Sequence, residues 1–217
     1  MDIYIPEGYG DTRPAVYLIH GINGYEASWV DKGYAIDTLE TMLAEGRCQP
    51  VMLIMPDCNK WPFKERPVKH GNLWKCLVRY SRLSREHEIE RAVSDLIDMI
   101  DTTYHVSSCA IAGLSDGARI AANVANIRPD RIGAVGMFSP VVHRDQLPDT
   151  TDITLLDTRC YSVYVGKKDI FGANGKRYYR RLHKREEQAR YVEFPENHTW
   201  RMWRRCLADF LEHVLCE

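Results

Sequence analysis

The sequence predicts an α/β fold in which a mostly parallel β-sheet is covered by helices on both faces. Short, β-rich apolar runs alternate with helical stretches along almost the whole chain, and this alternation requires crossover connections between parallel strands. The apolar runs are continuous, which is typical of strands that are buried on both faces. The chain has no internal repeat, low-complexity tract or linker, so residues 1–217 are predicted to form a single domain.

The predicted strands are short apolar runs, and the first two are closed by Gly21 and Pro56. In chain order the strands cover residues 14–20, 50–55, 107–112, 132–138, 160–165 and 190–194. Between them, apolar residues at three- and four-residue spacing predict helices. These helices cover residues 30–45, 85–104, 116–127, 174–188 and 199–215.

Composition and charge exclude several classes of protein. Hydrophobic residues make up 45% of the chain and charged residues 27%, which is ordinary for a globular protein and excludes disordered, collagen-like and coiled-coil chains. The net charge of -1 gives no electrostatic reason to expect nucleic acid or a membrane surface as a partner. No apolar run is long enough to span a membrane, and residues 1–6 lack the layout of a signal peptide.

The cysteine content predicts reduced thiols. The count is odd, so at least one thiol is unpaired, and no C-x-x-C pair indicates a zinc ribbon or a thioredoxin-like site. The seven residues are Cys48, Cys58, Cys76, Cys109, Cys160, Cys206 and Cys216. We therefore expect a cytoplasmic protein, with a secreted disulfide protein as the alternative.

The strongest local motif is Gly113-Leu-Ser-Asp-Gly117, which matches the G-x-S-x-G nucleophile elbow. It lies between the predicted strand 107–112 and the predicted helix 116–127, as this motif requires. Ser115 would sit on a strained turn that lifts its hydroxyl above the sheet, and glycines two residues away on either side let strand and helix approach closely. The alternative is an ordinary strand–helix turn with a capping serine.

A nucleophilic serine needs a base and an acid that orients the base. In doubly wound hydrolases the acid and then the histidine follow the serine in the chain, at the carboxyl ends of later strands. Asp169 and His198 occupy such positions, so Ser115, Asp169 and His198 are predicted to form a catalytic triad. Asp157 is the rival acid, although it precedes its nearest strand, and the rival bases are His70 and His143.

The segment from His20 to Gly24 follows the first strong strand and supplies a candidate oxyanion hole. Acyl transfer needs N–H donors aimed at the developing oxyanion, one from this loop and one from the residue after the nucleophile. We therefore expect the amides of Ile22 and Asp116 to bind the oxyanion, and Gly21 and Asn23 to contact substrate. The alternative is a glycine-rich turn without a role. The chemistry implies no metal ion and no organic cofactor.

With these motifs the chain resembles α/β-hydrolases of the putative-esterase (esterase D-like) family, which includes feruloyl and acetyl esterases, S-formylglutathione hydrolases, enterochelin esterases and mycolyltransferases. The resemblance runs from about Tyr4 to the C-terminus. The segments that carry it are Tyr17-Leu-Ile-His-Gly-Ile-Asn-Gly24, Ser28-Trp29, Met55-Pro56, Ala110-Ile-Ala-Gly-Leu-Ser115 and His198-Thr-Trp200 with Trp203, Leu207, Phe210 and Leu211. The resemblance implies an α/β-hydrolase fold whose N-terminal strands are shortened here, because the chain reaches its first strong strand so early.

The sequence departs from the family pattern beside the nucleophile. Asp116 and Ala118 stand where the family commonly has Met and a second Gly, and Asn197 stands where a Gly often precedes the histidine. A carboxylate on Asp116 that pointed into the site would oppose the transition state. We therefore expect it to point outward, where it would disfavour anionic acyl groups.

Two further segments bear on partners. Residues 57–84 contain Trp61 and Trp74 among basic side chains and form either a cap or substrate loop that contacts an aryl or sugar group, or a loop held by its aromatic residues. The basic helix 174–188 is predicted to be a solvated surface rather than a nucleic-acid site.

The sequence predicts a serine carboxylester hydrolase that acts through an acyl-enzyme on small, aryl or sugar-linked esters. An acyltransferase or a thioesterase with the same triad is one alternative. A non-catalytic carbohydrate-binding member of the fold is another, because fold does not fix function. The expected partner is a small-molecule or carbohydrate ester, with neither nucleic acid nor membrane, and the sequence leaves a homo-oligomer open.

Overall fold

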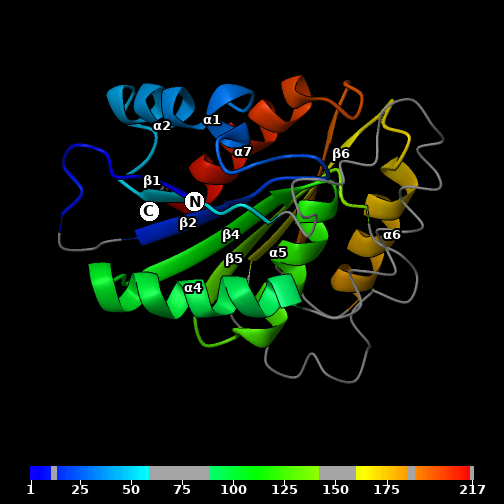
Figure 1. The fold of residues 1–217 in the computed structure, drawn as a ribbon. Coiled ribbons are helices and arrows are strands. Elements are labelled where there is room, and N and C mark those ends of the chain that lie inside the picture. Colours follow the sequence, from blue (N-terminus) through cyan, green and yellow to red (C-terminus); the bar gives the residue numbers. More distant parts are fainter. Residues whose placement is uncertain (11–13, 59–87, 142–159, 185–188, 216–217) are drawn as a thin grey trace.

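A computed structural model describes residues 1–10, 14–58, 88–141, 160–184 and 189–215, and it arranges them as a seven-stranded sheet between two layers of helices (Figure 1). The strands lie in the order β1-β3-β2-β4-β5-β6-β7, and all neighbours are parallel except β1, which is antiparallel to β3. Their bounds are β1 Asp2–Tyr4, β2 Pro14–Ile19, β3 Met52–Met55, β4 Ser108–Leu114, β5 Ile132–Phe138, β6 Cys160–Gly166 and β7 Ala189–Phe194. The prediction of a mostly parallel sheet is confirmed.

Helices cover both faces of this sheet, as predicted. Helices α1, α2 and α7 pack on one face, and α4, α5 and α6 pack on the other (Figure 1). Their bounds are α1 Ser28–Asp31, α2 Ala35–Ala44, α4 Glu88–Tyr104, α5 Asp116–Ile127, α6 Gly172–His183 and α7 Trp200–Leu215. Within the described ranges, no helix combines the length and the apolar character that crossing a membrane requires.

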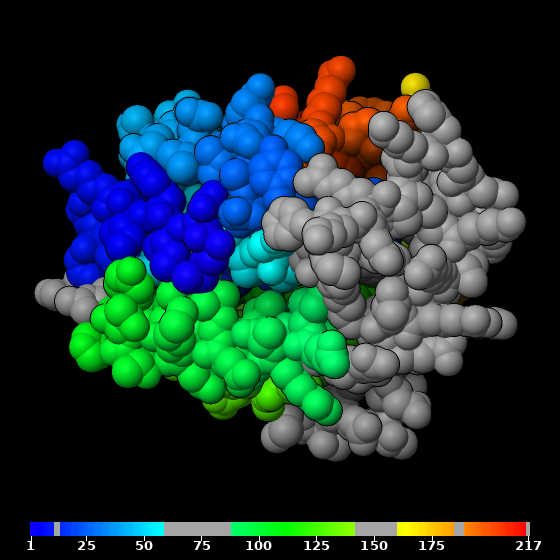
Figure 2. All heavy atoms as spheres, in the orientation of Figure 1, coloured from blue at the N-terminus to red at the C-terminus, as the bar shows by residue number. Residues whose placement is uncertain are grey.

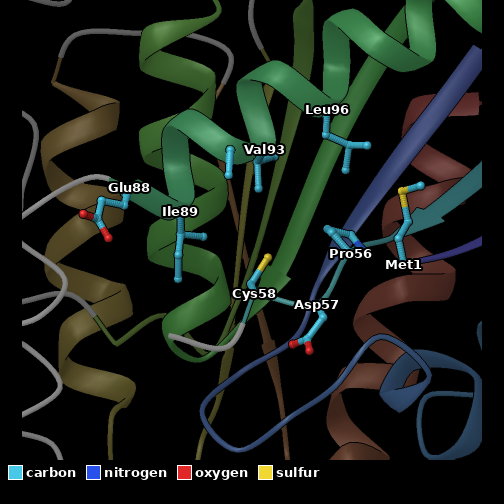
Figure 3. Close-up of a pocket in the computed structure, with 9 residues that line it drawn as sticks. Met1, Pro56, Asp57, Cys58, Glu88, Ile89, Val93 and Leu96 are labelled. Carbon is cyan, nitrogen blue, oxygen red and sulfur yellow. The ribbon is translucent and has the colours of Figure 1, made fainter. Parts of the chain in front are cut away.

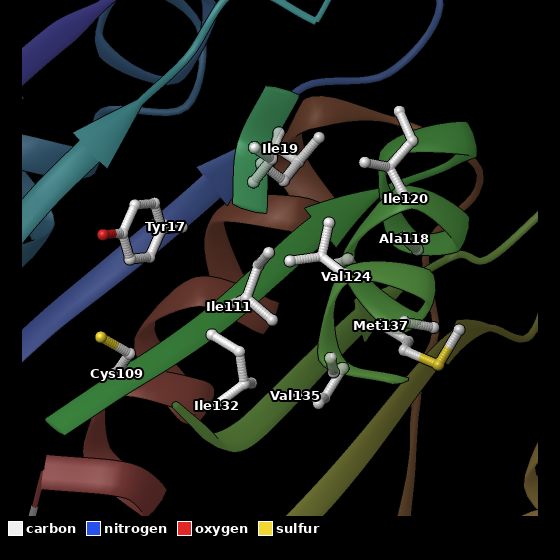
Figure 4. Close-up of a cluster of buried hydrophobic side chains, with 14 of the residues drawn as sticks. Tyr17, Ile19, Cys109, Ile111, Ala118, Ile120, Val124, Ile132, Val135 and Met137 are labelled. Atoms are coloured by element: carbon white, nitrogen blue, oxygen red, sulfur yellow. The ribbon is translucent and has the colours of Figure 1, made fainter. Parts of the chain in front are cut away.

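The two faces of the sheet bury two separate cores, because side chains alternate along each strand. In β2, Tyr17 and Ile19 face the core under α4 and α5, whereas Val16 and Leu18 face the core under α2 and α7. Figure 4 shows part of the first core, where Val124 of α5 packs with strand side chains. This double burial explains why the strands read as continuous apolar runs in the sequence.

The predicted helix 30–45 is wrong in one respect, because the structure divides this region into α1 and α2. The break falls at Gly33 and Tyr34. A Cβ on Gly33 would lie 2.7 Å from the Trp29 ring, and Tyr34 has a left-handed backbone with φ of 50°. A regular helix cannot pass through a left-handed residue, so the helix restarts at Ala35.

A short strand that the sequence analysis did not single out lies at the edge of the sheet. β1 pairs with β3 from Asp2 to Tyr4, and its partly buried Ile3 packs against the core. In the space-filling view the N-terminal residues lie between α1 and α2 on one side and α4 on the other (Figure 2). β1 thus adds a three-residue antiparallel strand to this edge of the sheet.

Parallel strands bring their carboxyl ends to one edge of the sheet, and that edge carries the candidate site. Register pairs Ile19 with Gly113, and Leu114 with Phe138, so β2, β4 and β5 end side by side. Gly166, the last residue of β6, pairs with Phe194, the last residue of β7. The loops that follow these strands therefore meet, as ligand-binding loops do in open α/β sheets.

Candidate active site

Ser115 lies on a strained turn between β4 and α5. Its backbone has φ of 57° and ψ of -118°, which a residue with a Cβ adopts only at a cost of order 1–3 kcal/mol. The surrounding structure holds the turn, because the Ser115 N–H donates to the Phe138 carbonyl at 2.8 Å and its own carbonyl accepts from the Val141 N–H at 3.2 Å. The turn has the geometry expected of a nucleophile elbow.

The two glycines of the motif are required by close backbone contacts. A Cβ on Gly113 would run into the backbone of Gly117, and a Cβ on Gly117 would lie 2.6 Å from the Ile19 carbonyl oxygen. Neither neighbour is a flexible side chain that could move aside. The first turn of α5 therefore packs directly on the ends of β4 and β2.

We expect Gly117→Ala to lower the free energy of unfolding by about 3 kcal/mol, because the added methyl group forces backbone segments apart. Gly133→Ala is the matched control, since a Cβ there would meet the Cys109 carbonyl at an ordinary 3.8 Å. Urea denaturation of both variants measures the difference. Equal stabilities for the two variants would contradict this account of the elbow.

His198 joins Ser115 to Asp169 through a continuous hydrogen-bond chain. The His198 Nε2 atom lies 3.1 Å from the Ser115 Oγ atom, and its Nδ1 atom lies 3.0 Å and 3.2 Å from the two carboxylate oxygens of Asp169. With a proton on Nδ1 directed at the carboxylate, Nε2 is free to accept the serine proton. The structure thus brings together the three side chains that the sequence analysis selected from separate strands.

The environment of Asp169 keeps its carboxylate ionised. Burial opposes ionisation, but hydrogen bonds from His198, Ser139 and the Phe171 N–H outweigh that effect and hold the pKa of Asp169 below its ordinary value of 3.8. The Phe171 N–H lies 2.8 Å from the Oδ1 atom of Asp169. The side chain of Asp169 is fully buried, whereas that of His198 retains 19% exposure. His198 is thus the member of this pair that solvent or a ligand can reach.

Aromatic rings fix the position of His198. The rings of Phe171 and Trp203 both lie 5.0 Å from the imidazole, measured between centroids, in edge-on arrangements. The Trp203 indole N–H donates to the Ser139 hydroxyl at 3.2 Å, so the same tryptophan also contacts the polar surroundings of Asp169. His198 is therefore held by packing as well as by its two hydrogen bonds.

The loop after β2 lies directly against Ser115. A Cβ on Gly21 would lie 2.6 Å from the Leu114 Cδ1 atom and 3.3 Å from the Ser115 Cβ atom, so the loop approaches the end of β4 closely here. Among the described residues, no backbone hydrogen bond uses the amide of Ile22 or Asp116 as its donor. Asn23 is exposed, with φ of 60°.

His20 supports this loop, a role that the sequence analysis did not assign. Its Nε2 atom lies 2.9 Å from the Cys58 backbone nitrogen and 3.2 Å from the Oδ1 atom of Asp57. Its Nδ1 atom lies 2.8 Å from the Gly21 carbonyl oxygen. The buried ring therefore fixes the Gly21–Ile22 peptide plane. The sequence feature that could have indicated this role is the position of His20 directly before Gly21.

The expectation that the Asp116 carboxylate points outward is wrong in that the side chain is buried. Only 5% of Asp116 is exposed, and Arg119, one turn further along α5, donates to its carboxylate from Nε at 2.9 Å and from Nη2 at 3.2 Å. Arg119 was not predicted as this partner, although Asp and Arg three residues apart on a helix are neighbours.

A cavity of about 540 Å³ lies between the end of β3 and the first turns of α4 (Figure 3). Ser115, Asp169 and His198 are absent from its lining, but it adjoins the loop after β2 because Asp57 and Cys58 contact His20. Its lining is mostly apolar and consists of Met1, Pro56, Asp57, Cys58, Glu88, Ile89, Ala92, Val93 and Leu96.

Some sequence-based candidates lie outside the described residues. They include Trp61 and Trp74, together with nearly all of the segment 57–84 that was expected to form a cap or substrate loop. The rival acid Asp157 and the rival bases His70 and His143 also lie outside. Among the described residues, no group of three or more His, Cys, Asp or Glu side chains is placed to hold a metal ion.

Comparison with known proteins identifies a family match. The family model described as "Putative esterase" matches residues 1–158. A curated endo-1,4-beta-xylanase/feruloyl esterase from Xylanibacter ruminicola is 24% identical over 98% of this chain. The alignment covers 29% of that protein, so the chain spans less than a third of its length.

Solved structures share the fold at low sequence identity. A ferulic acid esterase from the anaerobic fungus Anaeromyces mucronatus superposes with a TM-score of 0.74 at 20% identity, covering 97% of this chain and 82% of that one. A mutant of the feruloyl esterase module from Clostridium thermocellum, in complex with sinapinate, superposes with a TM-score of 0.75 at 14% identity, covering 97% and 81%. The architecture described above is therefore shared with these two proteins.

Proposed function

Because the chain belongs to the putative-esterase family of α/β-hydrolases, and is an esterase, we propose that it is a serine carboxylester hydrolase that works through an acyl-enzyme. One observation carries the proposal. The hydroxyl of Ser115, on a strained strand-to-helix turn, lies at the end of a hydrogen-bond chain that runs through His198 to the buried Asp169. We further propose that residues 1–217 act as one domain.

In the first half of the proposed reaction, His198 Nε2 takes the proton of Ser115 as the Oγ atom attacks the ester carbonyl carbon. Asp169 holds the imidazole in the required tautomer and stabilises its cation. The amides of Ile22 and Asp116 donate to the oxyanion of the tetrahedral intermediate. His198 then gives its proton to the alkoxide oxygen as the C–O bond breaks, and the alcohol leaves an acyl group on Ser115.

In the second half, His198 removes a proton from water, whose oxygen attacks the acyl carbon. Collapse of the second tetrahedral intermediate releases the acid, and the proton on His198 returns to Ser115. All groups that move protons or bind the oxyanion belong to the chain itself. Every step of the hydrolysis is therefore accounted for by the five residues named in these two paragraphs.

We propose esters of aryl acids or sugar-linked acyl groups as substrates. Support comes from the ferulic acid esterases and the sinapinate complex among proteins of the same fold, and from the feruloyl esterase named for the curated relative. Further support comes from the partly exposed side chain of His198 and from the loop after β2, which approaches Ser115 closely at Gly21. Trp61 and Trp74 remain the candidates for contact with an aromatic or sugar ring.

The test combines an ester panel with active-site labelling. The purified chain is expected to hydrolyse p-nitrophenyl acetate and methyl ferulate, and a fluorophosphonate probe is expected to modify Ser115, as located by peptide mass spectrometry. Product analysis with added alcohol or thiol acceptors distinguishes hydrolysis from acyl transfer. A folded chain that neither hydrolyses any ester nor reacts with the probe at Ser115 would overturn the proposal.

A further inference from the structure

A buried ion cluster lies directly behind the first turn of α5. Arg119 lies at its centre and donates two hydrogen bonds to Asp116 on its own helix. A third hydrogen bond runs from the Arg119 Nη1 atom to the Oε1 atom of Glu90 on α4, at 2.6 Å. Asp116, Arg119 and Glu90 are 5%, 2% and 1% exposed. Water therefore screens these charges little, and their mutual arrangement decides the local electrostatic potential.

The position of this cluster matters because Asp116 follows Ser115. Its backbone amide is the proposed second donor of the oxyanion hole. The residue that would bind the negatively charged substrate oxygen in the transition state therefore also carries a carboxylate. An uncompensated carboxylate at this place would oppose charge development on the substrate oxygen. The Arg119 guanidinium donates to both carboxylate oxygens of Asp116, from Nε to Oδ1 at 2.9 Å and from Nη2 to Oδ2 at 3.2 Å.

We propose that Arg119 is a positioning residue of the oxyanion hole, which neutralises the Asp116 carboxylate and holds it away from the developing oxyanion, while Glu90 fixes the guanidinium from α4. This inference rests on the proposed serine-esterase function. Arg119 acts through Asp116 and touches no reacting atom. The chain thereby tolerates an acidic residue next to the nucleophile.

Two features of the cluster fit a fixed guanidinium. Asn123, one turn beyond Arg119, donates to the same Glu90 oxygen at 3.2 Å, which anchors the carboxylate between two residues of α5. Burial alone would raise the pKa of Glu90, but the charge and hydrogen bonds of Arg119 outweigh it and lower that pKa. Glu90 therefore stays ionised and keeps Arg119 in place. A lysine has no planar fork and could not reach both oxygens of Asp116 in this way.

The test begins with Arg119→Met, which removes the charge while keeping a long apolar side chain. We expect kcat for p-nitrophenyl acetate to fall by about 10- to 100-fold with a much smaller change in KM, because the transition state carries the charge that the free Asp116 carboxylate opposes. Arg128→Met is the matched control. Arg128 also forms ion pairs, to Asp98 and Asp130, but at the far end of α5, and its loss is expected to leave kcat unchanged.

Two double variants separate charge compensation from a structural role. Arg119→Met leaves two carboxylates without the guanidinium, but only that of Asp116 lies beside the oxyanion. Adding Asp116→Asn to Arg119→Met is therefore expected to restore most of the lost kcat, whereas adding Glu90→Gln is expected to restore little. Rescue by both substitutions, or by neither, would show that Arg119 acts only as a structural support and would overturn the inference.

Thermal unfolding of each variant shows which ones are folded. If Arg119→Met does not fold, Arg119→Lys replaces it in the same comparison, because it keeps the charge and loses only the fork. A partial loss of kcat is then expected, again rescued by Asp116→Asn alone, and any other pattern overturns the inference. An unmodified chain without esterase activity would instead overturn the proposed function, so the two failures are distinguishable.

Discussion

Ser115→Ala is expected to lower kcat for ester hydrolysis by about 10⁴- to 10⁶-fold, because the substitution removes the proposed nucleophilic oxygen. The residual rate would come from the oxyanion amides and from substrate binding, which the substitution leaves in place. Initial rates with p-nitrophenyl acetate, measured at high enzyme concentration, quantify the loss. Substrate binding, measured by competition, should change little.

The fold should survive this substitution. Alanine has the same backbone preferences as serine at the unfavourable φ of 57°, so the strain of the turn is unchanged and the melting temperature should stay close to that of the unmodified chain. Ser108→Ala, at the exposed start of the same strand, is the matched control and should keep full activity. Full activity in Ser115→Ala would rule out Ser115 as the nucleophile.

Asp169→Asn is expected to lower kcat by about 10⁴-fold with little effect on KM. The amide has the size of the carboxylate, but its NH₂ group favours the wrong tautomer of His198 and cannot stabilise the imidazolium. The pH-dependence of stability offers a second readout. Because the pKa of Asp169 is lowered on folding, its contribution to the free energy of unfolding is present above about pH 3.8 and is lost as the pH falls through the lowered pKa.

The variant should therefore lose less stability than the unmodified chain on acidification below that pH. Asp209→Asn is the matched control. Asp209 lies on α7, is partly exposed and forms an ion pair with Arg190 at 2.6 Å. It should retain the kcat of the unmodified chain. An Asp169→Asn variant with the kcat of this control would remove Asp169 from the mechanism and would leave the rival acid Asp157 to be tested in the same way.

The central strands could be predicted because burial on both faces leaves a strong pattern in the sequence. The structure places β5 at the predicted residues 132–138, and α5 begins at Asp116 as expected. The break between α1 and α2 could not be predicted from apolar spacing, because it depends on how closely Gly33 approaches Trp29. β1 was missed because a three-residue edge strand carries almost no periodic signal.

The site could be predicted where chain order and strand ends limit the choice. Asp169 and His198 each follow a strand that ends at the same sheet edge as Ser115, so topology alone brings them close. Arg119 was not predicted as the partner of Asp116. Its role depends on burial and on Glu90, which arrives from α4, and sequence spacing indicates only that Asp116 and Arg119 are neighbours.

The hydrogen bond between His198 and Ser115 joins residues 83 positions apart, across the whole carboxyl half of the sheet. We expect a contact of such long range to form late, because closing the chain between its residues costs conformational entropy. Hydrolytic activity should therefore be among the last properties to return when the denatured chain refolds. Recovery of ester turnover, measured together with tryptophan fluorescence during refolding, would report when folding is complete.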